Sequence, residues 1–246
     1  MSVPHVDPPV PATSVLVDLR NFTPNLNAAD QDADGTNRFC HFLALFYAAT
    51  LDACLAALAP KERADPTLSV NGTGDGLLVV FLGPRHFANG LLAAYLLEAG
   101  LRRCCSLRHG MLPVVSFGVG VESGEVSLVH AGDGPASVNT FIGHCVNVAA
   151  RIEGLTKLIA GATVVVGDTT VERCAHAFYG ETFAQLRDRE QRETVDAKRI
   201  AIQKRMNEMN RGLCLAFLDR YTLKGVDEPV PLYRLDGSAT RKGVDR

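Results

Sequence analysis

Two short apolar runs, each beside an aspartate, constrain this chain more than any other feature. Residues 15–17 precede Asp18, and Asp75 lies in a glycine-flanked turn before residues 77–81. Both runs are typical of buried strands, where an unpaired carboxylate needs a cation, a cluster of donors or a metal ion. Either aspartate alone can also be a helix cap or a turn residue. The pair favours a hard divalent metal.

Length and composition indicate an ordinary globular protein. The chain has 246 residues, of which 47% are hydrophobic, enough for a packed core in one large domain or two small ones. A net charge of -2 gives no electrostatic reason to expect binding to nucleic acid or to an anionic membrane. The 7 cysteines are scattered, without the spacing of a zinc site. We therefore expect reduced thiols and a cytoplasmic location.

The two ends of the chain are expected to lie outside the folded part. Residues 1–13 are rich in proline and have no apolar stretch, so they predict a disordered lead that is neither a signal peptide nor a membrane anchor. Residues 237–246 predict a flexible tail. No segment has the roughly 18 uninterrupted apolar residues that span a bilayer, so no membrane partner is expected.

Strand-like and helix-like segments alternate along the rest of the chain. Glycines at 72, 74 and 76 predict one hairpin, and Glu122–Gly124 predicts the turn of a second. The pattern predicts an α+β fold in which helices pack on an antiparallel-rich sheet. The expected strands are 14–19, 68–70, 77–81, 114–121, 125–129, 163–166, 217–223 and 230–235, and the expected helices are 37–58, 84–104, 141–158 and a short one after Asp168.

Residues 181–212 carry many charges of both signs. Asp188 and Arg192 have the i,i+4 spacing of a helical ion pair, as do Arg189 and Glu193. The segment predicts one long, exposed helix inserted in the domain. It is either a solvated helix packed at one end or a regulatory or dimer-contact element.

Five sequence motifs occur in order along the chain, and together they resemble the catalytic domain of class III nucleotidyl cyclases. The resemblance spans residues 14–235 and implies a single ferredoxin-like catalytic domain over residues 14–236. Its most specific part is VNVAAR together with the upstream GDG and the downstream LKG. The segments are VLVDLRNFT, NGTGDGLLVVF, VSFGVGVESGEV, FIGHCVNVAARIEGL and YTLKGVDEPVPLYRL.

The resemblance assigns the two aspartates to a metal site. In this family two such carboxylates hold two magnesium ions, so Asp18 and Asp75 are expected to bind Mg²⁺, with Mn²⁺ as a substitute. The count fits magnesium, which takes one or two carboxylates and completes its shell with phosphates and waters. The backbone carbonyl of Leu19 is a further expected ligand. The amides of Asn21, Phe22 and Thr23, at the start of a helix, are expected to bind phosphate.

Asn147 and Arg151 carry the second half of the expected chemistry. They are four residues apart, so both project from one face of a helix. The resemblance implies that Asn147 positions the ribose and Arg151 stabilises the transition state, a role that suits a permanently charged guanidinium. Without the flanking motifs, Arg151 would be taken for a residue on a solvated helix face and Asn147 for one hydrogen-bonded to the backbone. Lys224 matches a lysine that contacts the terminal phosphates.

Base selection is where the sequence departs from the family pattern. Asn71 and Thr140 stand where adenylyl cyclases commonly have lysine and aspartate, and where guanylyl cyclases have glutamate and cysteine. Both side chains can donate and accept hydrogen bonds, so they can still recognise adenine by hydrogen bonding. We expect an enzyme that converts ATP to 3',5'-cyclic AMP and pyrophosphate. The alternatives are guanylyl cyclase activity, a catalytically silent nucleotide-binding module, or an unrelated ligand-binding domain.

The resemblance also implies a homodimer. Family members place the metal aspartates on one catalytic domain and the base, ribose and phosphate residues on another. One chain here carries both sets, so a two-fold dimer with two shared active sites is expected, with a nucleoside triphosphate as substrate.

Overall fold

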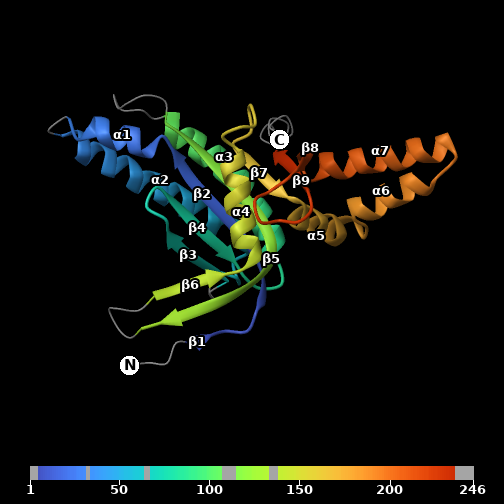
Figure 1. Ribbon diagram of the computed structural model, residues 1–246, viewed down its shortest axis with the longest axis horizontal. Coiled ribbons are helices and arrows are strands. Elements are labelled where there is room, and N and C mark those ends of the chain that lie inside the picture. Colours follow the sequence, from blue (N-terminus) through green and yellow to red (C-terminus); the bar gives the residue numbers. More distant parts are fainter. Residues whose placement is uncertain (1–4, 32–33, 64–66, 107–114, 133–137, 236–246) are drawn as a thin grey trace.

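The computed structural model describes residues 5–31, 34–63, 67–106, 115–132 and 138–235. Within these residues a 9-stranded sheet forms the centre of the molecule (Figure 1). β5 and β7 are parallel, and every other neighbouring pair of described strands is antiparallel. The main strand order is β3 (Leu68–Gly72), β4 (Gly76–Phe81), β2 (Val10–Arg20), β5 (Ser116–Ala131), β7 (Val164–Gly167), β9 (Val230–Leu235) and β8 (Leu215–Tyr221), while β1 (His5–Val6) and β6 (Val138–Ile142) also pair with β5.

Helices cover both faces of the sheet, as the continuous burial of its central strands β4 and β7 requires. Val15, Val17 and Leu19 on β2 pack in one cluster with α2 (Gly35–Ala57) and α3 (His86–Ser106). The opposite face is covered by α4 (His144–Leu155), whose buried residues pack on β7 and β9. The predicted α+β architecture is therefore confirmed. Two shorter helices, α1 (Phe22–Ala29) and α5 (Asp168–Tyr179), follow β2 and β7.

The predicted turn at Glu122–Gly124 was wrong. Residues Ser116–Ala131 form one long strand, and the hairpin is made instead by β5 and β6. The glycines of this segment make room for α4. A Cβ atom on Gly120 would lie 2.1 Å from the carbonyl oxygen of Ala149, and one on Gly124 would lie 2.9 Å from the Cβ of Cys145. Both glycines allow a helix to approach a strand closely. Sequence reasoning took Gly124 for a turn residue.

The expected disorder over residues 1–13 does not extend to the part that the structure describes. His5–Val6 pairs with the far end of β5, and β2 already begins at Val10. Pro11 is tolerated because β2 has only β5 beside it there, since pairing with β4 starts at Thr13. The predicted tail, residues 237–246, lies outside the described residues.

Residues 181–212 form a helical hairpin and not the single long helix predicted. The hairpin consists of α6 (Phe183–Arg192) and α7 (Asp196–Gly212), and we call it the arm because it projects from the sheet (Figure 1). The Glu193 carboxylate accepts a hydrogen bond from the Val195 amide at 3.0 Å, in the bend between the helices. At its base, Phe183, Leu186 and Met209 are buried in the main core.

By length and composition alone, α2 would also suit a membrane span, and no other helix in the described ranges does. In this fold its buried side chains, among them Phe39, Phe46 and Cys54, belong to the core shared with α3. Part of the apolar surface of α2 is therefore buried in the core of the protein.

Candidate active site

The sheet brings Asp18 and Asp75 together. Asp18 lies opposite Gly76 where β2 pairs with β4, and the Leu19 amide donates a hydrogen bond to the Asp75 carbonyl oxygen at 2.9 Å. Burial raises the pKa of Asp18, and the neighbouring Asp75 carboxylate raises it further. A divalent cation between these carboxylates would relieve that repulsion.

Glycines make this approach possible. A Cβ atom on Gly76 would lie 2.1 Å from the Val17 carbonyl oxygen and 3.1 Å from the Asp18 Cα. Gly74 has a φ of +93°, a conformation that side chains disfavour. Tyr47 from α2 donates a hydrogen bond to the Gly74 carbonyl and supports the turn. The GDG segment is therefore fitted to hold Asp75 against the end of β2.

A lysine that sequence reasoning missed lies at the same place. The Lys157 ammonium, just beyond α4, is 3.1 Å from Asp18 Oδ2 and 3.8 Å from Glu153 Oε2. Hydrogen bonding and the charges of Asp18 and Glu153 outweigh burial and raise the pKa of Lys157. The signal was present, because Glu153 and Lys157 have the i,i+4 spacing of a helical ion pair.

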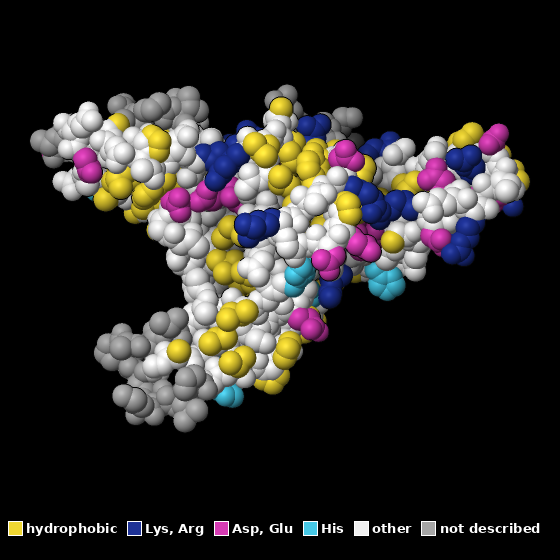
Figure 2. All heavy atoms as spheres, viewed as in Figure 1, with side chains coloured by type: hydrophobic (Ala, Val, Ile, Leu, Met, Phe, Trp, Pro, Cys, Tyr) yellow, Lys and Arg dark blue, Asp and Glu magenta, His cyan; other side chains and the backbone are white. Residues whose placement is uncertain are grey.

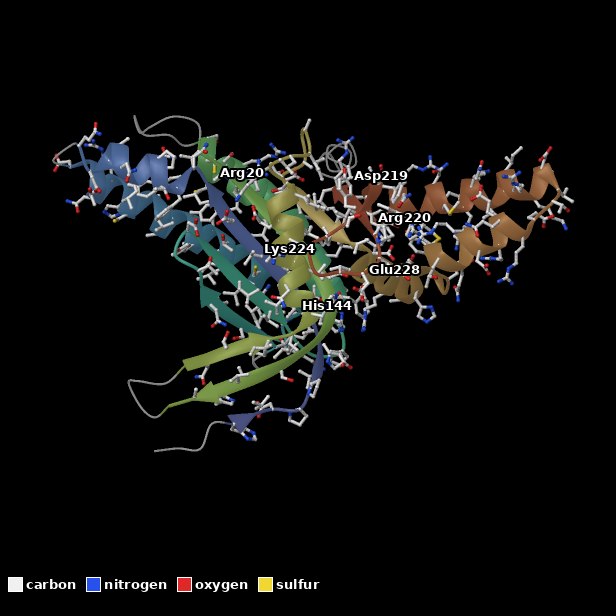
Figure 3. All side chains as sticks on the ribbon, viewed as in Figure 1. Arg20, His144, Asp219, Arg220, Lys224 and Glu228 are labelled. Carbon is white, nitrogen blue, oxygen red and sulfur yellow. The ribbon has the colours of Figure 1, made fainter. Side chains whose placement is uncertain are left out.

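Glu153 and Arg20 complete this charged cluster. Glu153 is buried, and its Oε1 has no hydrogen-bond partner within the described parts of the chain. Burial and the charge of Asp18 raise its pKa. Arg20 donates a hydrogen bond to Thr156 Oγ1 at 2.6 Å. Figure 2 shows acidic side chains grouped beside the position at which Figure 3 labels Arg20.

The donor set fits Mg²⁺ better than a metal held by protein alone. The described residues contain no group of three or more His, Cys, Asp or Glu placed to hold a metal ion. Asp18 and Asp75 supply two carboxylates, which is the usual number for Mg²⁺ when phosphates and waters complete its shell. The predicted ligand pair is thus suited to a metal that arrives with a phosphorylated substrate.

The predicted phosphate-binding segment directly follows Asp18. Asn21 has a φ of 61° and is the N-cap of α1, so Phe22 and Thr23 begin the helix. The first amides of a helix lack partners within it and suit an anion. Leu19 has a buried side chain, so any role in ligand binding falls to its backbone.

The remaining predicted residues lie on other elements. Asn147 and Arg151 are exposed on α4, and the structure assigns their side chains no hydrogen bond or ion pair within its described ranges. Lys224 is also exposed, and the neighbouring Leu223 packs with Val148 and Ile152 on the buried side of α4. Figure 3 shows Lys224 beside α4. These three residues are thus grouped around one helix.

The predicted base-reading residues lie on two strands that do not pair with each other in the described sheet. Asn71 is on β3 and Thr140 is on β6, opposite Leu78 and Val129 respectively. Both side chains are half-buried. Their neutral amide and hydroxyl groups can each donate and accept hydrogen bonds.

Comparison with known proteins found no matching family model and no matching curated protein. Solved structures do match. The adenylyl cyclase CyaB from P. aeruginosa superposes with a TM-score of 0.60 at 16% identity, over 94% of this chain and 95% of that one. The guanylyl cyclase Cya2 gives 0.55 at 20% identity, over 93% and 92%.

A third similar structure is the guanylate cyclase domain of RhGC from Catenaria anguillulae in complex with GTP. Its TM-score is 0.58 at 16% identity, with 91% of this chain and 94% of that chain covered. At such low identities the likeness carries the fold and not the substrate. The chain therefore has the fold of the class III adenylyl and guanylyl cyclase catalytic domain.

Proposed function

We propose that the protein is a nucleotidyl cyclase that converts ATP to 3',5'-cyclic AMP and pyrophosphate. The observation that carries this proposal is the juxtaposition of Asp18 and Asp75 at the paired ends of β2 and β4. It occurs in a fold shared with an adenylyl cyclase and a guanylyl cyclase of known structure. Two carboxylates beside a helix N-terminus suit a metal-bound triphosphate.

Asp18 and Asp75 would hold the divalent ions, with Mg²⁺ as the expected metal and Mn²⁺ as a substitute. When bound, such ions lower the pKa of an attacking hydroxyl and neutralise charge on the phosphates. The first-turn amides of α1 would orient the triphosphate. Lys157 would leave Asp18 and remain beside Glu153, whose second oxygen already lacks a partner in the described structure.

Asn147 and Arg151 would act on the ribose and the α-phosphate. Both are exposed and face away from the buried side of α4, so they are free to meet a substrate outside their own sheet. A guanidinium matches the geometry of phosphate oxygens and keeps its charge throughout the reaction. Lys224 would bind the terminal phosphates.

The active site would be shared between two copies of the chain. Lys157 fixes the C-terminal end of α4 beside Asp18, and Asn147 is ten residues earlier, roughly 15 Å away along a helix. A substrate that is bound at Asp18 of one copy and contacts Asn147 and Arg151 of the other copy would not have to span this distance. Figure 2 shows the surface hollowed between the α1 side and the β5–β6 hairpin, which would offer a seat for the partner.

ATP is the proposed substrate because the neutral side chains of Asn71 and Thr140 can form hydrogen bonds with adenine. The test is to incubate the purified full chain with ATP or GTP and either Mg²⁺ or Mn²⁺, and to measure cyclic product by chromatography. Cyclic AMP formation that requires a divalent ion is expected. Formation of cyclic GMP alone would reverse the base choice, and no product from either nucleotide would refute the cyclase proposal.

A further inference from the structure

A cavity of about 450 Å³ lies at the base of the arm. Its walls come from α3, from the end of α5 and from the segment that joins α7 to β8. α3 covers the face of the sheet opposite to α4, so this arm-base cavity is separate from the candidate active site. Its volume is within the range of small-molecule binding sites.

One wall of the cavity holds a buried hydrogen-bond donor without an acceptor. Asn89 is only 1% exposed, and its Nδ2 atom has no hydrogen-bond partner in the described part of the chain. Leaving such a group unpaired destabilises the folded protein, because the group loses its hydrogen bonds to water. Because Asn89 lines the cavity, a ligand oxygen there would recover this loss.

Two further features of the cavity lining are unusual in a folded protein. Cys214 has a φ of 50°, an unfavourable conformation for a residue other than glycine. Leu92 and Phe178 also line the cavity and are 44% and 60% exposed. Backbone strain tends to be kept where it serves a ligand, and neighbouring exposed apolar side chains indicate a binding surface.

The charge at the cavity indicates the kind of ligand. Arg85 lines the cavity, and none of its described lining residues is acidic. The backbone N–H of Asn89 donates a hydrogen bond to the backbone carbonyl of Arg85 at 2.9 Å. The two residues therefore have helical i,i+4 spacing, and their side chains share one face. An anion with hydrogen-bond acceptors would satisfy both.

We propose that the arm-base cavity binds a small organic carboxylate with an apolar body. The carboxylate accepts hydrogen bonds from Asn89 and Arg85, and the apolar part lies against Leu92 and Phe178. No residue of this cavity belongs to the proposed catalytic set, so the proposal stands or falls independently of cyclase activity.

Calorimetric titration of the full chain with 4-phenylbutyrate tests the proposal, with 4-phenylbutanol as the uncharged analogue. We expect saturable binding of the acid at one site per chain and at least tenfold weaker binding of the alcohol. Asn89→Leu and Leu92→Trp should each weaken binding of the acid at least tenfold. Leu55→Trp is the matched control, because Leu55 on α2 is also 44% exposed, and it should bind as the wild type does.

A second measurement keeps the test valid if a variant does not fold. Bound 4-phenylbutyrate should slow the reaction of the Cys214 thiol with N-ethylmaleimide by at least fivefold, measured by peptide mass spectrometry. Cys40, exposed on α2, is the internal control and should react at an unchanged rate. Absent saturable binding, equal binding of acid and alcohol, or an unprotected Cys214 would each overturn the proposal.

Discussion

The end of α4 and its middle differ in how their charged groups are satisfied. Just beyond the helix, Lys157 is paired with Asp18 and lies near Glu153, so this region is a closed charge network inside one chain. In the middle, Asn147 and Arg151 are exposed, and the described structure gives their side chains no partner. The proposed function accounts for this difference: a metal ion would replace Lys157 beside Asp18, and a substrate would contact the exposed Asn147 and Arg151.

Removing the proposed metal ligands should have the largest effect. Asp18→Ala and Asp75→Ala should each lower kcat at least about a thousandfold, because charge stabilisation by divalent ions contributes several kcal/mol. Both variants should also lose binding of Mn²⁺ as seen by electron paramagnetic resonance. Wild-type Mn²⁺ binding in either variant would remove that aspartate from the metal site.

Arg151→Ala should cost about 10²–10³ in kcat, the usual effect of losing one transition-state donor. In contrast to the aspartate variants, it should bind Mn²⁺ as the wild type does, because Arg151 is not part of the charge network at Asp18. Arg211→Ala on the arm is the control. An Arg151→Ala enzyme with full activity would show that the exposed middle of α4 is only a solvated surface.

Gly120→Ala should destabilise the protein by about 1–3 kcal/mol, because the added methyl group meets the α4 backbone at Ala149 and Glu153. Urea unfolding measures this cost. Gly154→Ala is the control and should be tolerated, because Gly154 lies on α4 with open space around it. If both substitutions unfold at the same urea concentration, α4 does not pack on β5 as described.

Lys157→Met should have the smallest effect, and in the opposite direction. It removes a cation that competes for Asp18, so Mn²⁺ affinity should rise about fivefold, since a half-exposed ion pair contributes about 1 kcal/mol. Lys198→Met, which breaks the 3.7 Å pair with Glu193 on the arm, should leave the affinity unchanged. Weaker Mn²⁺ binding by Lys157→Met would mean that the lysine supports the metal site.

The sequence predicted those features that depend on local pattern. The apolar runs beside Asp18 and Asp75 identified β2 and β4, and the glycines at 72, 74 and 76 identified the turn between β3 and β4. It failed at Gly124, because a glycine that admits a packed helix looks the same as one that forms a turn. The contact between Lys157 and Asp18 joins residues 139 positions apart, and no local pattern encodes such a distance.

The proposal of a shared active site is tested most directly by mixing two variants that are expected to be inactive. Asp18→Ala and Arg151→Ala, unfolded together and refolded as a 1:1 mixture, should recover roughly a quarter of wild-type cyclase activity. The reason is that half of random two-fold dimers are mixed, and each mixed dimer has one of its two sites intact. Activity no higher than that of the separately refolded variants would contradict a site built from two copies of the chain.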